Sequence, residues 1–430
     1  MFALAMIFYN IAFPILFVIY FPFYKRKLEK RGGYKEGFGE RFGKFDEEKL
    51  KHLHALKDPV WIHAVSVGET VVALRFIEKW LETDPTLNII LSTTTSTGQK
   101  IARDKAPDSV TIIYAPIDLV TCVKRTLNAL RPKSLIIFEV EIWPNLIRQC
   151  QKRGIELSLI NCRMSDKSAA GFKKHAWFFK HLFKAFKLIA VQGNDDAKRV
   201  TSVIGKSDKI FISGTMKFDQ IPDVKAAEFT ETSLIFPDDA LIFTAASIHP
   251  GEPEIMLDCF LKLREKQPKL RLILVPRHVE KKDQFIKCLE DRQVNYTSLT
   301  DLRSSNESVE KDVLLVDTTG EMMSILALSD IVFVGKSLGG NEGGHNVIEP
   351  AVFGKAIICG SQMQNFRLVV SLFTEAKAIL QVADAKAFEH ALDALIEDDA
   401  KRIALGEAAR ELVEQKRGAI DATIAKLINY

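Results

Sequence analysis

A glycine-rich stretch in the second half of the chain, residues 335–350, has a composition that could bind an anion. It reads Gly-Lys-Ser-Leu-Gly-Gly-Asn-Glu-Gly-Gly-His-Asn-Val-Ile-Glu-Pro and follows the apolar run 331–334. Five glycines within ten positions let the backbone adopt positive φ and approach a ligand closely. A helix beginning near His345 and Asn346 would add unpaired N–H groups, and Glu349 could accept hydrogen bonds from ribose hydroxyls. The stretch predicts a phosphate site, although such loops also occur without a nucleotide.

Carboxylates follow two predicted strands in the first half of the chain. The turn Ser66–Gly68 follows residues 60–65 and brings Glu69 to the start of a helix. A partly desolvated carboxylate at that place suits a general base, or it only complements the helix dipole. Glu139 ends another strand and Glu141 follows it, and two acids beside a buried strand are costly without partners. The positions of these acids predict a site with reactive groups at the carboxyl edge of a sheet.

Hydroxyl and basic groups follow other predicted strands. Residues 92–98 read Ser-Thr-Thr-Thr-Ser-Thr-Gly, so Thr95 and Ser96 could line a polyol or phosphate site, whereas a helix cap needs only one hydroxyl. Arg163 could bind a phosphate or a carboxylate, or it could pair with one of the two acids. Lys217 could stabilise a developing anion, although a lone lysine is more often a solvated surface residue.

The second half offers basic groups after its strands as well. His249, Arg277 and the turn at Gly320 each follow a predicted strand, and together with the glycine-rich stretch they would surround one pocket. Basic side chains and backbone donors in one pocket suit a nucleotide phosphate. No Gly-x-Gly-x-x-Gly motif opens either half and no Walker lysine is present, so dinucleotide redox chemistry and ATP hydrolysis lose support.

The charge distribution argues against nucleic acid and for a membrane surface. The chain of 430 residues has a net charge of +4, and residues 25–44 alone hold eight bases against three acids. All of the positive excess therefore lies beside the amino-terminal apolar run, unlike the charge of a nucleic-acid binder. The six cysteines are scattered, without a Cys-x-x-Cys or a Cys/His cluster, so we expect reduced thiols, a cytosolic face and no structural metal.

Residues 1–24 predict a membrane anchor. The run Phe2–Tyr24 is almost continuously apolar, and as a helix it would span about 34 Å, enough to cross the hydrocarbon core. The basic residues follow the run, which disfavours a cleaved signal peptide and places the remaining chain on the cytoplasmic face. Asn10, Pro14 and Pro22 interrupt the run, so a shallow position in the interface is an alternative to a full span.

Short, almost continuously apolar runs alternate with helical periodicity from Val60 onward, which is typical of parallel sheets covered on both faces. The runs are 60–65, 88–92, 111–115, 134–139, 156–161, 188–192 and 209–213, then 241–245, 270–275, 313–316, 331–334, 356–359 and 378–382, with a polar loop at 296–312. The sequence thus predicts an α/β fold with two doubly wound, Rossmann-like domains facing a cleft. The predicted segments are an anchor (1–24), a first domain (25–213), a crossing (214–240), a second domain (241–398) and C-terminal helices packing back on the first domain (399–430).

Nine motifs, in order along nearly the whole chain, resemble those of bacterial 3-deoxy-D-manno-octulosonic acid (Kdo) transferases. They are WIHAVSVGE (61–69), STTTSTG (92–98), EIWPN (141–145), QGNDD (192–196), GTMKFD (214–219), ASIHPGE (246–252), VPRH (275–278), DTTGEM (317–322) and GGHNVIEP (343–350). The chain departs from the family pattern at a few positions. Lys336 stands where we expect glycine, Val347 where proline is usual and Cys162 in place of alanine.

The resemblance implies a GT-B fold and inverting transfer of Kdo from CMP-Kdo to a glucosamine hydroxyl of a lipid A precursor. The reaction would need no metal or other cofactor and would occur at the cytoplasmic leaflet of the Gram-negative inner membrane, among its lipids. Carried over by motif, Glu69 is the proton acceptor, and Glu139 and Lys217 stabilise the transition state. The implied CMP contacts are Pro276, Arg277, Gly320, Glu321, Met322, Asn346, Val347, Ile348 and Glu349. Further substrate contacts could come from Ser66, Gly68, Thr95, Ser96, Arg163, His249, Gly343, Gly344 and His345.

Three other functions fit parts of this pattern. A nucleotide-sugar epimerase can share the two-domain fold and catalytic carboxylates, but it acts on soluble substrates and gains nothing from an anchor. A UDP-sugar transferase acting on a lipid is a nearer alternative, and a catalytically silent nucleotide-sugar binder is a third. Residues 37–43, directly after the anchor, are either a contact for a lipid-borne substrate or a connector. The motifs do not encode the number of Kdo units transferred, the acylation preference or the oligomeric state.

Overall fold

The computed structural model describes residues 1–31, 36–221, 229–305 and 309–429. The chain forms two units, which are described separately: Met1–Gln220 together with Arg417–Tyr430, and Ile221–Lys416. Parts of three predicted segments lie outside the described residues, namely 32–35 of the basic flank, 222–228 of the crossing and residue 430 of the tail.

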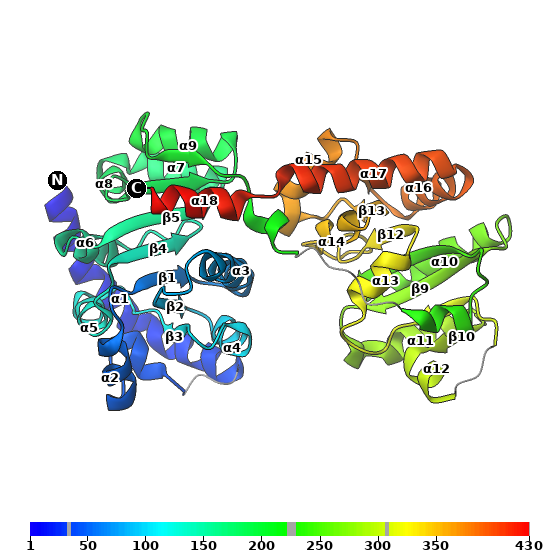
Figure 1. Cartoon of the computed structure of the whole chain (residues 1–430), viewed down its shortest axis with the longest axis horizontal. Helices are drawn as coiled ribbons and strands as arrows, with labels where there is room; N and C mark the ends of the chain where they lie inside the picture. Colours follow the sequence, from blue (N-terminus) through cyan, green and yellow to red (C-terminus); the bar gives the residue numbers. More distant parts are fainter. Residues whose placement is uncertain (32–35, 222–228, 306–308, 430) are drawn as a thin grey trace. The chain divides into compact units, whose positions relative to one another are not determined.

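The first unit is built on a parallel sheet of seven strands in the order β3-β2-β1-β4-β5-β6-β7 (Figure 1). The strands are β1 (Val60–Ala64), β2 (Ile89–Thr93), β3 (Thr111–Tyr114), β4 (Ser134–Phe138), β5 (Glu156–Cys162), β6 (Leu188–Val191) and β7 (Ile210–Ile212). These are the seven strands predicted for the first half, with ends that differ by one residue at most. All five positions of β1 are buried, as expected of a strand covered on both faces.

Helices cover both faces of this first sheet. They are η1 (Phe38–Phe42), α2 (Glu47–Ala55), α3 (Val67–Thr83), α4 (Ser96–Lys105), α5 (Val120–Leu130), α6 (Pro144–Lys152), α7 (Asp166–Lys174), α8 (Ala176–Phe183), α9 (Asn194–Ile204), η2 (Met216–Asp219) and α18 (Ala419–Ile428). Successive residues of one strand point to opposite faces of the sheet. Ile137 of β4 packs in the hydrophobic cluster on one face, and Phe138 packs in the cluster on the other face. This alternation explains why the strands read as continuous apolar runs.

The second unit repeats the architecture with a parallel sheet in the order β10-β11-β9-β8-β12-β13-β14. Its strands are β8 (Leu241–Ile248), β9 (Leu270–Pro276), β10 (Tyr296–Ser298), β11 (Val313–Leu315), β12 (Ile331–Val334), β13 (Ala356–Gly360) and β14 (Leu380–Val382). Its helices are η3 (Thr230–Leu234), α10 (Glu252–Arg264), η4 (Val279–Lys281), α11 (Lys282–Asp291), α12 (Leu299–Ser305), α13 (Met322–Leu328), α14 (Ile348–Val352), η5 (Gln364–Phe366), α15 (Arg367–Glu375), α16 (Ala385–Glu397) and α17 (Asp399–Lys416). The predicted doubly wound α/β class is confirmed for both units.

One strand and one helix of the second unit were not predicted. The supposed polar loop at 296–312 contains the edge strand β10 and the helix α12. β10 reads Tyr-Thr-Ser, so it lacks the apolar run that marks a strand covered on both faces. Its three residues are extended because they pair with β11, and not because their composition favours a buried strand.

The C-terminal segment divides between the units, which differs from the prediction that residues 399–430 pack together on the first domain. α17 contacts β13 and α14 of the second unit. α18 belongs to the first unit, where the carboxylate of Asp219 accepts hydrogen bonds from the N–H groups of Gly418 (2.7 Å) and Ile420 (2.9 Å). Gly418, with a φ of +96°, separates the two helices. Residues 214–220, which were predicted to begin the crossing 214–240, belong to the first unit.

The chain order reverses near the middle of each sheet. The reversal lies between β1 and β4 in the first sheet and between β8 and β12 in the second. Open parallel sheets bind ligands at the carboxyl ends of the strands beside such a reversal. The loops that follow these four strands are therefore where each unit should hold its functional groups.

The amino-terminal helix α1 (Phe2–Arg31) packs one face on the first unit. Within it, Phe2–Phe23 is long and apolar enough to cross a membrane by length and composition. Met6 is fully buried, the hydroxyl of Tyr9 donates to the Asp118 carboxylate at 2.9 Å, and the Asn145 amide donates to Asn10 at 2.7 Å. The other face is open, and the large apolar side chains that are more than half exposed on it are Leu4, Ile7, Phe8, Ile11, Ile15, Leu16, Val18, Ile19, Tyr20 and Phe23.

Candidate active site

The reversal between β1 and β4 gathers acids and bases of the first unit at one edge of the sheet. Glu139 is half-buried after β4; burial and the charge of Glu69 raise its pKa, while Arg163 and Lys217 lower it. Burial, followed by the charge of Glu69, raises the pKa of Glu141 to about 7. The structure thus brings together Glu69, Glu139 and Lys217, the three residues to which the resemblance assigns catalysis, with Arg163 beside them.

Glu69 is held in place by the turn that precedes α3. One carboxylate oxygen accepts from the N–H of Val65 at 2.9 Å and the other accepts from the hydroxyl of Ser66 at 2.7 Å. Ser66 in turn caps α3 and accepts from the N–H of Glu69 at 3.4 Å. The side chain is 8% exposed. Glu69 thus completes a helix cap, and its charge raises the pKa values of Glu139 and Glu141, while its role as a general base stays a prediction.

Backbone strain accumulates at the strand ends of the site. Glu139 (φ +58°) and Asn161 (φ +50°) in the first unit, and Ser247 (φ +55°) and Lys336 (φ +60°) in the second, adopt left-handed conformations that favour glycine. All four lie at the carboxyl ends of strands, namely β4, β5, β8 and β12. Of these strands, β4, β8 and β12 lie beside a reversal of chain order. Such strain costs of order 1–3 kcal/mol and marks functional positions.

Lys217 is positioned by its neighbours on η2. The side-chain oxygen of Asn161 accepts from the N–H of Met216 at 3.3 Å, and Thr215 caps η2. Asp219, at the other end of η2, binds the start of α18. Burial, and then the charge of Arg163, lower the pKa of Lys217 to about 8, against the opposing effect of Glu139. With its pKa near neutral pH, the protonation of Lys217 responds to a change in negative charge nearby.

The hydroxyl-rich segment 92–98 is mostly structural. Ser92 accepts from the indole N–H of Trp61 at 2.8 Å, and Thr95 caps α4 by accepting from Gly98 at 3.1 Å. The hydroxyl of Ser96 is buried without a hydrogen-bond partner among the described residues. Of the two predicted contacts in this segment, Thr95 uses its oxygen as the acceptor of the cap and keeps its O–H as a donor, whereas the unpartnered hydroxyl of Ser96 is itself buried. A Cβ on Gly68 would meet nothing within 4 Å, so that glycine leaves open space at the turn.

The second unit gathers cationic and imidazole groups at the reversal between β8 and β12. The Nε2 atoms of His249 and His345 lie 3.0 Å apart, and their rings stack with centroids 5.2 Å apart. Burial, and then the charge of Lys336, lower the pKa of His249 to about 4; burial, and then Arg277, lower that of His345 to about 3. Both histidines are therefore neutral near pH 7. Among the described residues, neither Arg277 nor Lys336 forms an ion pair with a carboxylate.

Four of the five glycines of residues 335–344 serve close packing, and Gly340 faces open space. A Cβ on Gly335 would lie 2.5 Å from the carbonyl oxygen of Ser247, and one on Gly339 would lie 2.6 Å from that of Gly251. Gly343 and Gly344 are also closely packed, since a Cβ on either would lie within 3 Å of a neighbouring side chain. The loop thus packs against the segment after β8. The expected helix start near His345 is wrong, because α14 begins at Ile348 and has only five residues.

The predicted CMP contacts differ in what they can offer a ligand. The Asn346 amide donates to the Glu349 carboxylate at 3.2 Å, and burial raises the pKa of Glu349. Val347 and Ile348 are fully buried, so neither offers an exposed surface to a ligand in this structure. The others follow strands or open a helix: Pro276 ends β9, Arg277 is exposed after it, Gly320 has a φ of +111°, and Met322 begins α13. Glu321 accepts from Arg303 at 3.1 Å, and its other carboxylate oxygen is buried without a partner among the described residues.

Glu252 is a positioning residue to which the sequence analysis gave no role. Its fully buried carboxylate accepts from the backbone N–H groups of His249 (2.8 Å), Lys336 (2.9 Å), Ser337 (2.9 Å) and Leu338 (3.1 Å). Burial raises the pKa of this carboxyl, and the four hydrogen bonds oppose the rise. Glu252 therefore joins the loops after β8 and β12. An acid directly after His-Pro-Gly was the available signal, but three of its four partners lie more than eighty positions away.

Replacing Lys336 by glycine should stabilise the protein while weakening nucleotide binding. Glycine relieves the left-handed strain, for a gain of up to about 1 kcal/mol. The loss of the ammonium group beside Gly343 should weaken CMP about tenfold. Lys377→Gly is the matched control, because Lys377 (φ +53°) is exposed after α15 and should gain stability without changing affinity. Thermal melts and calorimetric titration with CMP measure both effects; unchanged affinity in Lys336→Gly would remove Lys336 from the site.

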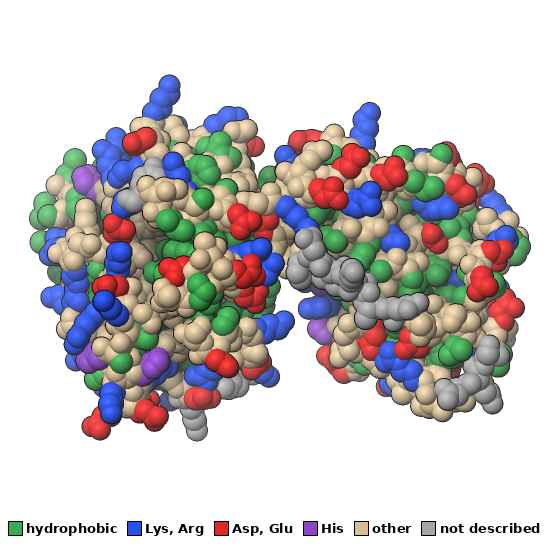
Figure 2. All heavy atoms as spheres, viewed as in Figure 1, with side chains coloured by type: hydrophobic (Ala, Val, Ile, Leu, Met, Phe, Trp, Pro, Cys, Tyr) green, Lys and Arg blue, Asp and Glu red, His purple; other side chains and the backbone are tan. Residues whose placement is uncertain are grey.

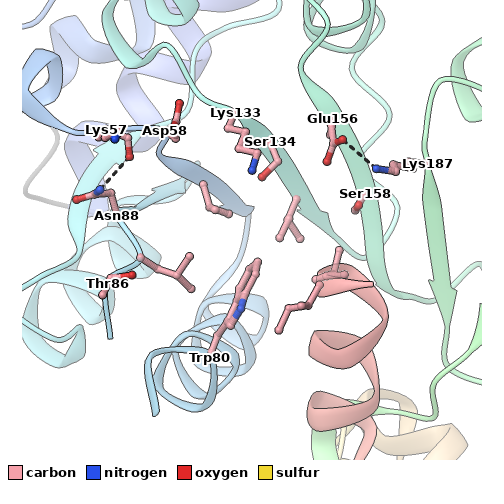
Figure 3. Close-up of a pocket in the computed structure, with 15 residues that line it drawn as sticks. Lys57, Asp58, Trp80, Thr86, Asn88, Lys133, Ser134, Glu156, Ser158 and Lys187 are labelled. Carbon is pink, nitrogen blue, oxygen red and sulfur yellow. Dashed lines mark hydrogen bonds and ion pairs between the residues drawn. The ribbon is translucent and has the colours of Figure 1, made fainter. Parts of the chain in front are cut away.

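Two further observations concern a cavity away from these acids and the groups that could bind a metal ion. A cavity of about 350 Å³ in the first unit is lined by residues at the amino ends of the strands, including Val60, Ser134 and Glu156, with Trp80 beside them (Figure 3). It therefore opens on the edge opposite the acids described above. The described residues contain no group of three or more His, Cys, Asp or Glu side chains that could hold a metal ion.

The two parallel seven-stranded sheets form a GT-B-like α/β fold, which solved structures of two-domain proteins share. A UDP-GlcNAc 2-epimerase from Neisseria meningitidis bound to UDP-GlcNAc has a TM-score of 0.59 and 11% identity, covering 86% of this chain and 100% of that one. A glycosyltransferase from Rickettsia africae has a TM-score of 0.55 and 13% identity, covering 87% and 97%. At these identities the likeness establishes the fold alone.

Sequence comparison identifies the family. The family described as 3-Deoxy-D-manno-octulosonic-acid transferase (kdotransferase) matches residues 36–220. A 3-deoxy-D-manno-octulosonic acid transferase from Haemophilus influenzae is 32% identical over 399 residues, 92% of each chain. The chain therefore belongs to the Kdo transferase family, a family of glycosyltransferases, as the motifs indicated. The epimerase alternative shares only the fold with this protein.

Proposed function

We propose that the protein transfers Kdo from CMP-Kdo to a glucosamine hydroxyl of a lipid A precursor, with inversion at the anomeric carbon. Family membership supports the Kdo transfer. The observation that carries the proposed mechanism is the grouping of Glu69, Glu139, Arg163 and Lys217 at one sheet edge, with mutual effects on the pKa values of Glu139 and Lys217. Acids and a cation at one edge suit proton abstraction with stabilisation of developing charge.

The second unit is proposed to hold the nucleotide. Arg277, Lys336 and the neutral pair His249 and His345 form a cationic cluster that suits a phosphate. Glu349, buried and hydrogen-bonded to Asn346, is suited to accept from ribose hydroxyls. Glu252 holds the two loops that carry these groups.

The chemistry of Kdo explains why these groups are needed. Kdo is an acidic ketose, so departure of CMP leaves oxocarbenium-like charge at the anomeric carbon and adds negative charge to the phosphate. Glu69 takes the proton of the attacking hydroxyl, while Glu139 and Lys217 offset the charges that develop. We propose that this transfer needs no metal or other cofactor, since the residues in these roles supply both the base and the cations.

The direct test is transfer in vitro. The protein is incubated with CMP-Kdo and tetra-acylated lipid A precursor, with and without EDTA, and the lipid is analysed by mass spectrometry. We expect the mass of at least one Kdo unit to be added at the same rate in both samples. Unchanged lipid would refute the transfer, and loss with EDTA alone would refute the metal-free mechanism. A UDP-sugar transferase would instead be protected by UDP, and an epimerase would convert a sugar nucleotide without any acceptor.

We further propose that α1 holds the protein on the cytoplasmic face of the inner membrane by lying in the interface. Its contacts with the first unit run along the helix: the rings of Phe2 and His181 stack at 4.8 Å, and those of Phe21 and Phe38 lie 6.3 Å apart. The helix between Phe2 and Phe21 is about 28 Å long. A spanning helix needs that length within the hydrocarbon core, which would bring the contacting parts of the first unit into lipid. An interfacial helix avoids this cost.

The surface beside α1 offers a second membrane contact. Trp177 of α8 is 46% exposed and borders the same apolar groove as Phe8 and Leu16 of α1. The exposed lysines of this region are Lys167, Lys173, Lys174, Lys180 and Lys184. On the face drawn in Figure 2, hydrophobic side chains and basic side chains lie together near the amino terminus. Interfacial tryptophan with surrounding lysines suits a bilayer that contains anionic lipid.

Removing this second contact should weaken membrane binding selectively. Trp177→Ala combined with Lys173→Gln and Lys174→Gln should lower the affinity for phosphatidylglycerol vesicles at least tenfold, because each basic residue contributes about 1 kcal/mol. Binding to phosphatidylcholine vesicles should change much less. Lys57→Gln with Lys133→Gln, at the amino edge of the sheet, is the control and should bind as the parent does. Equal losses in the two variants, measured by vesicle sedimentation, would exclude a specific contact through α7 and α8.

A further inference from the structure

A cavity of about 230 Å³ lies between α1 and the carboxyl edge of the first sheet. Three aromatic residues of α1 line one wall: Phe13, Phe17 and Tyr20. The opposite wall includes Ala115 and Trp143, which follow β3 and β4. We call this space the α1 cavity. Protein interiors are normally packed to high density, so a space of this size between two elements calls for an occupant.

The walls of the α1 cavity are well held, so it is not a loose joint between helix and sheet. Arg41 is buried, its guanidinium lies 4.0 Å from the centre of the Tyr114 ring, and its carbonyl accepts from Ile117 at 2.8 Å. Arg41, of the segment 37–43, is thus a packed part of the wall. The other charged group, Asp118, accepts from Tyr9 and from the backbone N–H groups of Asn145 and Leu146, at 2.8–2.9 Å.

The position of the α1 cavity connects lipid with the acids of the site. Tyr20 is 60% exposed, and Phe13 also borders the apolar groove outside α1 that Trp177 lines. The inner lining includes Trp143, two positions after Glu141, and Thr94, two positions before Ser96. One side of the cavity therefore meets the surface proposed to touch the membrane, and the other meets the carboxyl edge of the sheet.

We propose that the α1 cavity binds one hydrocarbon chain of the lipid acceptor. The proposal rests on the proposed function, and it adds a subsite for the acyl part of that substrate. Aromatic and aliphatic walls suit a hydrocarbon chain, which needs no hydrogen bonds, and the two charged groups of the lining already have partners. A chain held here keeps its apolar length beside α1, while the polar head of the lipid is directed to the acids.

Filling the α1 cavity should impair use of the acylated acceptor only. Ala115→Val and Ala115→Leu add side-chain volume in steps, and Ala55→Leu on the exposed surface of α2, away from the proposed membrane contacts, is the control. We expect Ala115→Leu to lower kcat/KM about tenfold for the tetra-acylated acceptor, with Ala115→Val in between, because each excluded methylene removes roughly fourfold in affinity. Rates with a fully deacylated, water-soluble acceptor should stay within about twofold. Equal losses with both acceptors, or no loss with either, would overturn the proposal.

A binding measurement separates this proposal from the proposed function. In a Trp177→Phe background, Trp143 reports on the cavity, since Trp61 and Trp80 are buried elsewhere on the sheet. Phosphatidylglycerol with brominated acyl chains should quench Trp143, and Ala115→Leu should relieve that quenching. If the parent protein transfers Kdo to neither acceptor, the proposed function fails, and relief of quenching still decides whether the cavity takes a chain. Quenching that Ala115→Leu leaves unchanged would place the lipid elsewhere.

Discussion

Glu69→Gln should lower the rate of transfer by about 10²- to 10⁴-fold, the range for loss of a general base. Glutamine keeps an oxygen that can accept from Val65 or Ser66, so the cap of α3 should survive and the melting temperature should change little. CMP should bind with unchanged affinity, since the proposed nucleotide residues belong to the other unit. Single-turnover rates, melting curves and calorimetry with CMP separate these effects. Substantial residual transfer would place the base elsewhere.

Two further variants test whether Glu69, and not another residue, acts as the base. Glu141 has a pKa near 7, a value that also suits a base working at neutral pH. If Glu141 were the base, Glu141→Gln would abolish the acidic limb of the pH–rate profile and cost as much as Glu69→Gln. Arg277→Ala is the complementary variant, because it should weaken CMP by roughly 10- to 160-fold, as expected for a lost charge-assisted hydrogen bond.

Lys217→Met should lower kcat by about 10²- to 10³-fold, the usual effect of removing one group that stabilises transition-state charge. The affinity for CMP should stay the same. The rate of the parent protein should also fall as the pH rises through about 8, because Lys217 then loses the proton that makes it a cation. Lys217→Arg should retain activity at high pH, since a guanidinium stays protonated.

The neighbours of Lys217 predict the direction of each shift in that alkaline limb. Arg163 lowers the pKa of Lys217, so Arg163→Gln should move the limb to higher pH. Glu139 raises the same pKa, so Glu139→Gln should move the limb to lower pH, in addition to its own loss of rate. Profiles of kcat against pH for the three proteins test both signs. Parallel profiles would mean that another group titrates.

The parallel sheets could be predicted because their strands are buried on both faces and read as continuous apolar runs. The same rule could not find β10, whose Tyr-Thr-Ser sequence lies at an edge of the sheet. It also could not divide the C-terminal tail, since Gly418 and the partners of Asp219 decide where α18 packs. These contacts join residues about two hundred positions apart.

The candidate site could be predicted to the extent that its groups follow strands. Glu69, Glu139 and Lys217 were recognised because parallel strands bring their carboxyl ends to one edge. The sequence could not show that Glu139 and Lys336 adopt left-handed backbones, because that strain is imposed by packing between loops. Nor could it show the packing role of Gly335 and Gly339, which meet backbone from β8 and its loop.

The packing of α1 has a practical consequence for anyone who wishes to produce a soluble form of this protein. Deleting the apolar helix would remove more than a tether, because Phe13 and Phe17 are walls of a binding space and Tyr9 is a partner of Asp118. The shortened protein would expose the apolar wall formed by Ala115, Trp143 and Leu146 and would leave Asp118 with only its two backbone partners, and it would tend to associate through that wall. Replacing only outward side chains such as Leu4 and Ile19 by polar residues would instead improve solubility and keep the inner face intact.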